Sequence, residues 1–280
     1  NFVIFERAKA IGGTWRDNHY PGCACDVPSH LYSIAAAPNP SWSRMFSPQP
    51  EILAYMQRVV QEHGLEQYIR YEADIVRAEF SAEFGNWTLT DRQGRITTVK
   101  AVIAALGPLN RAKWPEIAGI QAFEGHAFHT SQWDHAIALK GKKVAVIGTG
   151  ASAIQVVPAI ASEVAALTVF QRTAAWISNR NDHAISEKQQ RRFQRFPGLQ
   201  RLMRNIIYEV LEVRGRLFIG NRMIHRMLQK QCIGKLAREV EDPMIRQKLT
   251  PNYTLGCKRI LLSDDYLPTF NRPNVALETT

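Results

Sequence analysis

Short apolar runs alternate with glycine turns and amphipathic stretches along the chain, a pattern that predicts α/β units. The clearest example is the run VAVI at residues 144–147, which is of strand type and precedes an apolar helical stretch at 153–161. Between them, Gly148, Gly150 and Ala153 stand in a G-x-G-x-x-A spacing. A strand, a tight glycine turn and a helix in this order form the context of a dinucleotide-binding turn, in which backbone N–H groups approach a pyrophosphate. The alternative is a glycine-rich turn in an ordinary α/β unit.

The next apolar run, at residues 167–170, indicates which dinucleotide such a turn would bind. An NAD site places Asp or Glu near the end of this strand, where it binds the ribose 2′-hydroxyl group. Here the chain has Gln171 and Arg172 instead. A guanidinium group binds a phosphate through two parallel hydrogen bonds. We therefore expect NADP(H), with a surface arginine after an ordinary strand as the alternative.

Periodicity also predicts the elements before and after this unit. The first apolar run, at residues 2–5, is of strand type and ends at Glu6, where an acid would bind an adenosine ribose. Apolar residues recur at helical spacing over residues 51–64. The further predictions are strands at 75–80, 87–90 and 96–99, a buried strand at 102–105, several amphipathic helices within 184–250, a short helix opening at 264–266 and a strand-like end at 274–280.

Two longer patterns lie around these elements. The first is Gly12-Gly13-x-Trp15-x-x-x-x-Tyr20-Pro21-Gly22-x-x-x-Asp26, and the second is Phe123-x-Gly125-x-x-x-His129-x-x-x-Trp133-Asp134. Both resemble fingerprints of type I Baeyer–Villiger monooxygenases. The related flavin-containing N- and S-monooxygenases typically have Tyr at the position of Trp133. The likeness covers nearly the whole chain and is weakest over residues 184–250.

The resemblance implies an α/β fold with two Rossmann-like dinucleotide-binding domains, one for FAD and one for NADP, the second carrying a helical insertion. We expect a partial FAD-binding domain at residues 1–110, the first part of the NADP-binding domain at 111–183, the helical insertion at 184–250 and a return to the NADP-binding domain at 251–280. The chain opens inside a strand, with no initiator Met and no preceding glycine turn. We therefore expect this chain to be an internal piece of a longer protein, and expect the piece to lack both termini of that protein.

The resemblance also implies the residues of a site. Arg259 matches the family's catalytic arginine, and Asp26 matches the aspartate that orients this arginine beside the flavin. From residue types alone, Arg259 is only part of a basic pair before a strand, and Tyr32 fits a core tyrosine equally well. The expected cofactor-binding residues are Glu6, Gly13, Thr14, Trp15, Asp26, Tyr32, Gly148, Thr149, Gly150, Ser152, Ala153, Gln155, Arg172, Thr173, Lys258 and Arg259.

By the same resemblance, the expected activity is an FAD- and NADPH-dependent monooxygenation. It inserts one oxygen atom of O₂ next to a carbonyl by way of a C4a-peroxyflavin and converts a ketone to an ester or lactone. In this reaction Arg259 would stabilise negative charge without itself titrating. Two alternatives remain open. One is a flavin-containing monooxygenase that acts on nitrogen or sulfur, against which Trp133 argues, and the other is a non-catalytic fragment that binds NADP or nucleic acid.

Charge and cysteine usage limit the partners and the compartment. The net charge is +10, and residues 184–250 hold 15 Lys and Arg against 6 Asp and Glu. Such a segment suits nucleic acid or an anionic membrane, but a solvated helical face is the commoner explanation, so we expect a small-molecule substrate and no nucleic-acid partner. No apolar run reaches the roughly 20 residues of a transmembrane helix. Neither zinc-type spacing nor C-x-x-C occurs, and free thiols fit the cytoplasm; the cysteines are Cys23, Cys25, Cys232 and Cys257.

Overall fold

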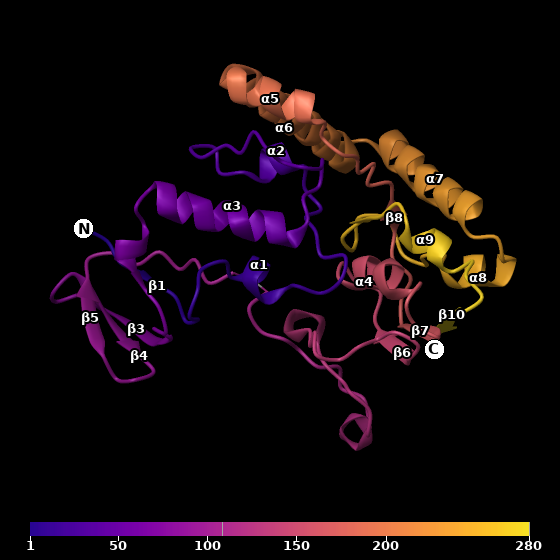
Figure 1. Cartoon of the computed structure of the whole chain (residues 1–280), viewed down its shortest axis with the longest axis horizontal. Helices are drawn as coiled ribbons and strands as arrows, with labels where there is room; N and C mark the ends of the chain where they lie inside the picture. Colours follow the sequence, from indigo (N-terminus) through magenta and orange to yellow (C-terminus); the bar gives the residue numbers. More distant parts are fainter. Residues whose placement is uncertain (108, 280) are drawn as a thin grey trace. The chain divides into compact units, whose positions relative to one another are not determined.

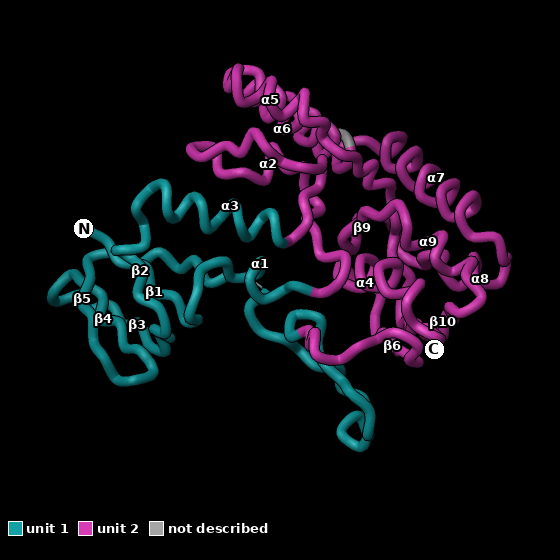
Figure 2. The backbone as a smooth tube through the Cα atoms, viewed as in Figure 1, with its two compact units in different colours: residues 1–19, 50–132 teal, residues 20–49, 133–280 magenta. Residues whose placement is uncertain are grey.

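The computed structural model describes residues 1–107 and 109–279. The chain packs into two compact units, which Figure 2 colours separately. The first unit comprises residues 1–19 and 50–132, and the second comprises residues 20–49 and 133–280. This division reflects packing within the chain and not ligand binding. The cofactor domains expected from the sequence therefore stay a prediction.

The strands of the first unit form two small sheets. Strand β1 (Ile4–Phe5) pairs in parallel with β2 (Ile69–Arg70), so the predicted first strand is present but short. A three-stranded antiparallel sheet has the order β3–β4–β5. Its strands are β3 (Ile75–Ser81), β4 (Asn86–Asp91) and β5 (Ile96–Val99), which confirms the predicted strands (Figure 1). The helical elements are α1 (Thr14–Asp17), α3 (Gln49–Glu62), η1 (Glu66–Tyr68), η2 (Ile120–Ala122) and η3 (Thr130–Gln132).

Local chemistry explains why the chain reverses between β4 and β5. The Asp91 carboxylate accepts hydrogen bonds from the backbone N–H groups of Gln93 (3.0 Å) and Arg95 (2.9 Å). The Arg95 guanidinium also donates to Asp91, at 2.5 Å. Gly94 lies between them with φ +80°, in the left-handed region that glycine adopts without strain. An aspartate that bonds to the backbone two residues on, followed by a left-handed glycine, is a common way to close such a turn.

The prediction of a buried strand at residues 102–105 is wrong. The structure has no strand there, and Ile103 is 91 % exposed. An apolar run becomes a strand only when a neighbouring strand satisfies its backbone N–H and C=O groups. Among the described residues, no strand pairs with this run. Sequence alone carries the apolar signal but not the presence of a pairing partner.

A parallel sheet forms the centre of the second unit. Strands β6 (Lys143–Ile147), β7 (Ala166–Gln171) and β10 (Val275–Thr279) pair in the order β10–β7–β6. Taken in chain order this is 3-2-1, the order of one half of a Rossmann fold. Helix α4 (Ala153–Ile160) follows β6, as predicted, and Val157 on it is fully buried. The glycine turn therefore stands at the carboxyl end of the first strand, where such folds bind ligands.

Helices α5 (Glu187–Arg195), α6 (Pro197–Gly220), α7 (Arg222–Glu239) and α8 (Pro243–Lys248) occupy the predicted helical region (Figure 1). Side-chain caps start three of them. Ser186 caps α5, Asn221 caps α7 and Asp242 caps α8, and each accepts hydrogen bonds from backbone N–H groups of the first turn. None of the described helices is both long and apolar enough to cross a membrane.

Four shorter elements of the described chain also belong to the second unit. Strand β8 (Ile177–Ser178) pairs in parallel with β9 (Leu261–Leu262), and so joins segments from before and after the helical region. Helix α2 (Ser29–Tyr32) contacts α6. Helix α9 (Tyr266–Thr269) forms where the sequence predicted a short helix.

Candidate functional site

The glycine turn after β6 presents open backbone. Gly148 has φ +102°, and its N–H group donates to the carbonyl of Phe170 on β7 at 2.9 Å. The Thr149 hydroxyl donates to the carbonyl of Thr173 at 3.0 Å, so the turn is fixed to the end of β7. A methyl group added at Gly148 or Gly150 would meet no other atom within 4 Å. The space in front of the turn is free for a ligand that approaches the backbone closely, and Ser152 and Ala153 open the helix behind it.

Gln171 and the predicted site residue Arg172, at the end of β7, differ in exposure. Gln171 is buried and donates from its amide to the carbonyl of Lys248 at 2.8 Å, so it serves packing. Arg172 is the next residue and is exposed. Its guanidinium is thus available at the strand end where a Rossmann fold binds the adenosine ribose.

The segment from Tyr20 to Ala24 lies on helix α4. Gly22 has φ +80°, and a methyl group there would come within 2.6 Å of the Gln155 carbonyl oxygen, so only glycine permits this approach. The Gln155 side-chain oxygen accepts from the Tyr20 hydroxyl (2.9 Å) and the Ala24 N–H group (3.4 Å), while its amide donates to the Ala24 carbonyl (3.0 Å). Gln155 therefore holds this segment on the helix. Its predicted contact with a cofactor stays a prediction.

Two residues past this segment, Asp26 forms an ion pair with Arg259. A terminal nitrogen of the guanidinium, Nη2, donates to the carboxylate oxygen Oδ2. The Arg259 side chain is 64 % exposed and that of Asp26 33 %. The structure thus brings together the two residues expected to act together, and it leaves the guanidinium accessible to a ligand.

The helical region fixes the loop that carries Arg259. The indole of Trp176 donates to the carbonyl of Tyr253 at 3.0 Å, and an imidazole nitrogen of His225 (Nε2) lies 2.7 Å from the carbonyl of Leu255. Buried Trp176, Cys232 and Leu255 form a cluster against which Tyr253 packs. The Lys258 ammonium lies 4.8 Å from the centre of the Tyr253 ring, a cation–π distance. Lys258 and Arg259 therefore project from an anchored loop.

The predicted residues of the first unit surround a second glycine turn. Gly13 has φ +47°, and a methyl group added there would meet nothing within 4 Å. Thr14 begins α1, and the Trp15 N–H group donates to the Gly12 carbonyl at 2.9 Å. The Glu6 carboxylate accepts a hydrogen bond from the Ala8 N–H group (2.7 Å) and forms an ion pair with the Arg16 guanidinium (3.3 Å).

Tyr32 is the one remaining predicted residue. It ends helix α2 in the second unit and is 41 % exposed. The alternative of a core tyrosine is therefore wrong. Exposure leaves its ring accessible, and its predicted contact with FAD stays a prediction.

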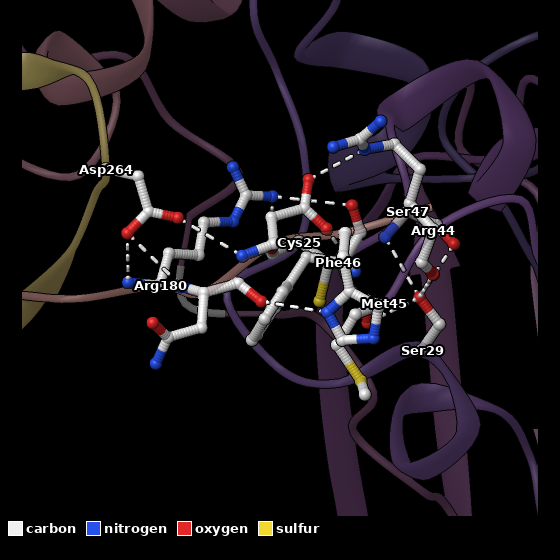
Figure 3. A network of polar contacts seen from close by, with 11 residues as sticks. Cys25, Ser29, Arg44, Met45, Phe46, Ser47, Arg180 and Asp264 are labelled. Atoms are coloured by element: carbon white, nitrogen blue, oxygen red, sulfur yellow. Dashed lines mark hydrogen bonds and ion pairs between the residues drawn. The ribbon is translucent and has the colours of Figure 1, made fainter. Parts of the chain in front are cut away.

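A polar network that no motif indicated includes Cys25, the residue before Asp26 (Figure 3). The Arg180 guanidinium donates to the carbonyl oxygens of Cys25 (2.9 Å) and Phe46 (3.4 Å). The Asp264 carboxylate accepts from the backbone N–H groups of Arg180 (2.8 Å), Asn181 (3.2 Å) and Asp182 (3.1 Å). Burial favours the neutral form of Asp264, but these hydrogen bonds outweigh it and lower the pKa of the carboxyl group.

The helical region also directs basic groups inward. The Arg204 guanidinium on α6 donates to the carbonyls of His30 (3.0 Å), Leu31 (2.6 Å) and Ser33 (3.0 Å). Lys235 is 2 % exposed and pairs with Glu239 at 2.8 Å. Part of the basic excess that composition places in this region therefore serves packing, which the sequence did not reveal.

Comparison with known proteins supplies the family. The model of the flavin-binding monooxygenase-like family matches residues 1–229. A Baeyer–Villiger monooxygenase of Pseudomonas aeruginosa is 44 % identical over 279 residues, which is 100 % of this chain and 53 % of that protein. The chain spans about half the length of the curated relatives it matches.

Solved structures of monooxygenases are also similar to this chain. Oxidized steroid monooxygenase bound to NADP superimposes with a TM-score of 0.88 at 29 % identity, over 98 % of this chain and 60 % of that one. OTEMO in complex with FAD and NADP superimposes with a TM-score of 0.85 at 27 % identity, over 98 % and 60 %. The likeness supports the Rossmann-type α/β fold and confirms the resemblance read from the two fingerprints. The chain belongs to the flavin-binding monooxygenase-like family.

Proposed function

We propose that this protein is an FAD- and NADPH-dependent monooxygenase that inserts one oxygen atom of O₂ next to the carbonyl of a ketone and gives an ester or lactone. One observation carries the proposal: an accessible guanidinium, Arg259, is paired with Asp26 in the unit that presents the glycine turn. The name of the Pseudomonas aeruginosa relative supports this reaction class.

The residues present fit a phosphorylated dinucleotide. The glycine turn has open space before its backbone, as a pyrophosphate needs, and exposed Arg172 follows the second strand, as a 2′-phosphate needs. We assign binding of NADP(H) to Gly148, Thr149, Gly150, Ser152, Ala153, Arg172, Thr173 and Lys258. Gln155 holds the segment with Tyr20 and Ala24, so any contact it makes with NADP(H) would use the same amide.

The residues of the second glycine turn, at Gly13, fit FAD in the same way. The absence of a side chain at Gly13 leaves room for close approach to the backbone. In the first unit we assign FAD contacts to Glu6, Gly13, Thr14 and Trp15, and the expected FAD contacts of Asp26 and Tyr32 in the second unit stay predictions. When bound, FAD and NADPH supply the reducing electrons and the activation of O₂.

The chain's own contribution is charge in a fixed place. A guanidinium is a fixed positive charge, so Arg259 stabilises the negative charge that develops on the substrate's carbonyl oxygen. Asp26 restricts the rotation of Arg259 through their hydrogen bond. A preorganised charge of this kind contributes of order 10²–10³ in rate.

Product analysis tests the proposal. The holoenzyme is supplied with NADPH and O₂, and with a cyclic ketone and a thioether in parallel, and the products are separated by gas chromatography. A lactone formed at the higher kcat/KM supports the proposal. Sulfoxide as the sole product would favour the nitrogen- and sulfur-oxidising alternative and overturn it.

The compartment belongs to the same proposal. All four cysteines are free thiols, and three of them, Cys23, Cys25 and Cys232, are buried. Reduced cysteines are typical of the cytoplasm, which is where we place the protein.

A further inference from the structure

We propose that Arg180 is a positioning residue: its guanidinium holds the backbone next to Asp26 in register with the strand that follows Arg259. The inference rests on the proposed function, because it assigns Arg180 to the same site. All of the contacts involved lie within the second unit.

On one side, Arg180 holds the chain at Cys25. A terminal guanidinium nitrogen, Nη2, donates to the Cys25 carbonyl at 2.9 Å, one residue before Asp26 (Figure 3). The same nitrogen lies 3.4 Å from the Phe46 carbonyl, and the guanidinium lies 5.1 Å from the centre of the Phe46 ring. The guanidinium thus bridges two chain segments, the loop of Asp26 and the loop at Phe46.

On the other side, the backbone at Arg180 is fixed to the segment that follows Arg259. Strand β8 ends two residues before Arg180, and it pairs with β9, which begins two residues after Arg259 (Ile177 opposite Leu261). Past both strands, Asp264 accepts the N–H groups of residues 180–182. One residue therefore connects the two segments that carry Asp26 and Arg259.

An arginine suits this role better than a lysine. Its planar group lies over the Phe46 ring while a terminal nitrogen donates to two carbonyls, whereas an ammonium group has no planar face. The inner nitrogen of Arg180, Nε, is buried without a hydrogen-bond partner in the described chain. Leaving a buried donor unpaired is unfavourable, and it indicates that the bonds of Nη2 determine where the group sits.

Other contacts keep the segment folded when the guanidinium is absent. The Cys25 N–H group donates to the Ser47 carbonyl at 3.0 Å, and Gln155 binds both backbone groups of Ala24. Loss of the guanidinium therefore loosens the chain at Cys25 and Asp26 without removing the fold. The Asp26 carboxylate then restrains Arg259 less well.

The test uses the holoenzyme and the variant Arg180→Met, with Arg44→Met as a matched control. Arg44 belongs to the same network and pairs with Asp182 at 2.7 Å, but among the described residues no hydrogen bond joins its guanidinium to the Cys25 segment. The first readout is independent of activity: the rate at which a thiol reagent labels Cys25, located by peptide mass mapping. Cys25 is 2 % exposed, and burial raises the pKa of its thiol to about 12, so labelling reports opening of this segment.

For Arg180→Met we expect labelling of Cys25 about tenfold faster, the effect of losing one charge-assisted hydrogen bond, and for Arg44→Met a change within about twofold. Equal labelling of Cys25 in Arg180→Met and the parent enzyme overturns the inference. If Arg180→Met does not fold, Arg180→Lys replaces it, and labelling faster than in the parent enzyme is expected because an ammonium group lacks the planar face that lies over the Phe46 ring. Unchanged labelling in that variant overturns the inference as well.

The second readout is the amount of ester or lactone formed per NADPH consumed. It is measured in a double-mutant cycle that combines Arg180→Met with Asp26→Asn. We expect Arg180→Met to lower this ratio about tenfold in the parent enzyme and to change it little once Asp26→Asn is present, because both act through Arg259. Equal losses in the two backgrounds would indicate a general structural role and overturn the inference. If no variant and no parent enzyme oxidises a ketone, the proposed function fails, while the labelling of Cys25 still decides the role of Arg180.

Discussion

Asp26 and Arg259 form an ion pair across 233 positions of the sequence, and the two side chains remain 33 % and 64 % exposed. A pair this exposed contributes little to folding, because water screens the attraction and both side chains lose freedom. The pair is therefore poorly explained as a stabilising contact. An exposed charge held in one orientation is what a reaction that develops negative charge requires.

Replacing Arg259 should separate activity from stability. We expect Arg259→Met to lower kcat for ester or lactone formation about 10²–10³-fold, since a preorganised positive charge is lost. The midpoint of thermal unfolding should shift little, because the side chain is mostly exposed. Product analysis and calorimetry measure the two effects. As a neighbouring control, Lys258→Met should change KM for NADPH more than kcat. Near-normal kcat in Arg259→Met would remove this residue from the mechanism.

Gly22→Ala should destabilise the protein more than an ordinary glycine replacement. The residue has φ +80°, and the new methyl group would lie 2.6 Å from the Gln155 carbonyl oxygen, so backbone must shift. Gly141→Ala in the same unit is the control, because Gly141 has φ +71° and nothing within 4 Å. We expect about 1 kcal/mol for the control and roughly 2–4 kcal/mol for Gly22→Ala, from denaturant unfolding. Equal losses of unfolding free energy in the two variants would mean that α4 and residues 20–24 can move apart at little cost.

His30 should make stability depend on pH. The ring is 3 % exposed, packs edge-on against Phe193 at 4.8 Å and has Gln200 at 3.4 Å from its nitrogen Nδ1. Burial lowers the pKa of His30 below its ordinary value of 6.5. At a pH between the two pKa values, His30 is therefore protonated in the unfolded chain and neutral in the folded chain. The His30 contribution is complete above about pH 6.5 and is lost as the pH falls from there towards the lowered folded pKa.

The variant His30→Gln tests this pH dependence, because its side chain is polar but does not titrate. We expect the free energy of unfolding of the parent to fall relative to the variant as the pH goes from 7 to 5, by at most about 1.4 kcal/mol per pH unit. Urea unfolding at several pH values measures it. Parallel curves for the two proteins would show that His30 is not the group responsible.

Local pattern was sufficient for much of the fold. Strands β6 and β7 and helices α3 and α4 lie within two residues of the predicted bounds, because alternation, helical spacing and glycine turns are encoded along the chain. The run at 102–105 shows the limit. Its residues have strand character, but strand formation also depends on a partner strand that composition does not specify.

The candidate site divides in the same way. The glycine turn was visible in spacing, whereas the contact between Asp26 and Arg259 followed only from family resemblance. Neither residue spacing nor family resemblance indicated a role for Arg180. Its side chain binds backbone carbonyl groups, which every residue has. Gln155 was expected at a cofactor, and its side chain also binds Ala24, a use that depends on how closely two segments approach. Long-range contacts to backbone leave no signature in side-chain patterns.

Arg172 should set the preference for NADPH over NADH. It is exposed directly after Gln171, the last residue of β7, where no carboxylate stands to bind a ribose hydroxyl. We expect Arg172→Ala to raise KM for NADPH about 10–100-fold and to change KM for NADH little, because a charge-assisted, two-bond contact with the 2′-phosphate is lost. Steady-state kinetics with both nucleotides measures this, and Arg272→Ala, distant in sequence, controls for loss of surface charge. An equal rise in both KM values would place the 2′-phosphate elsewhere.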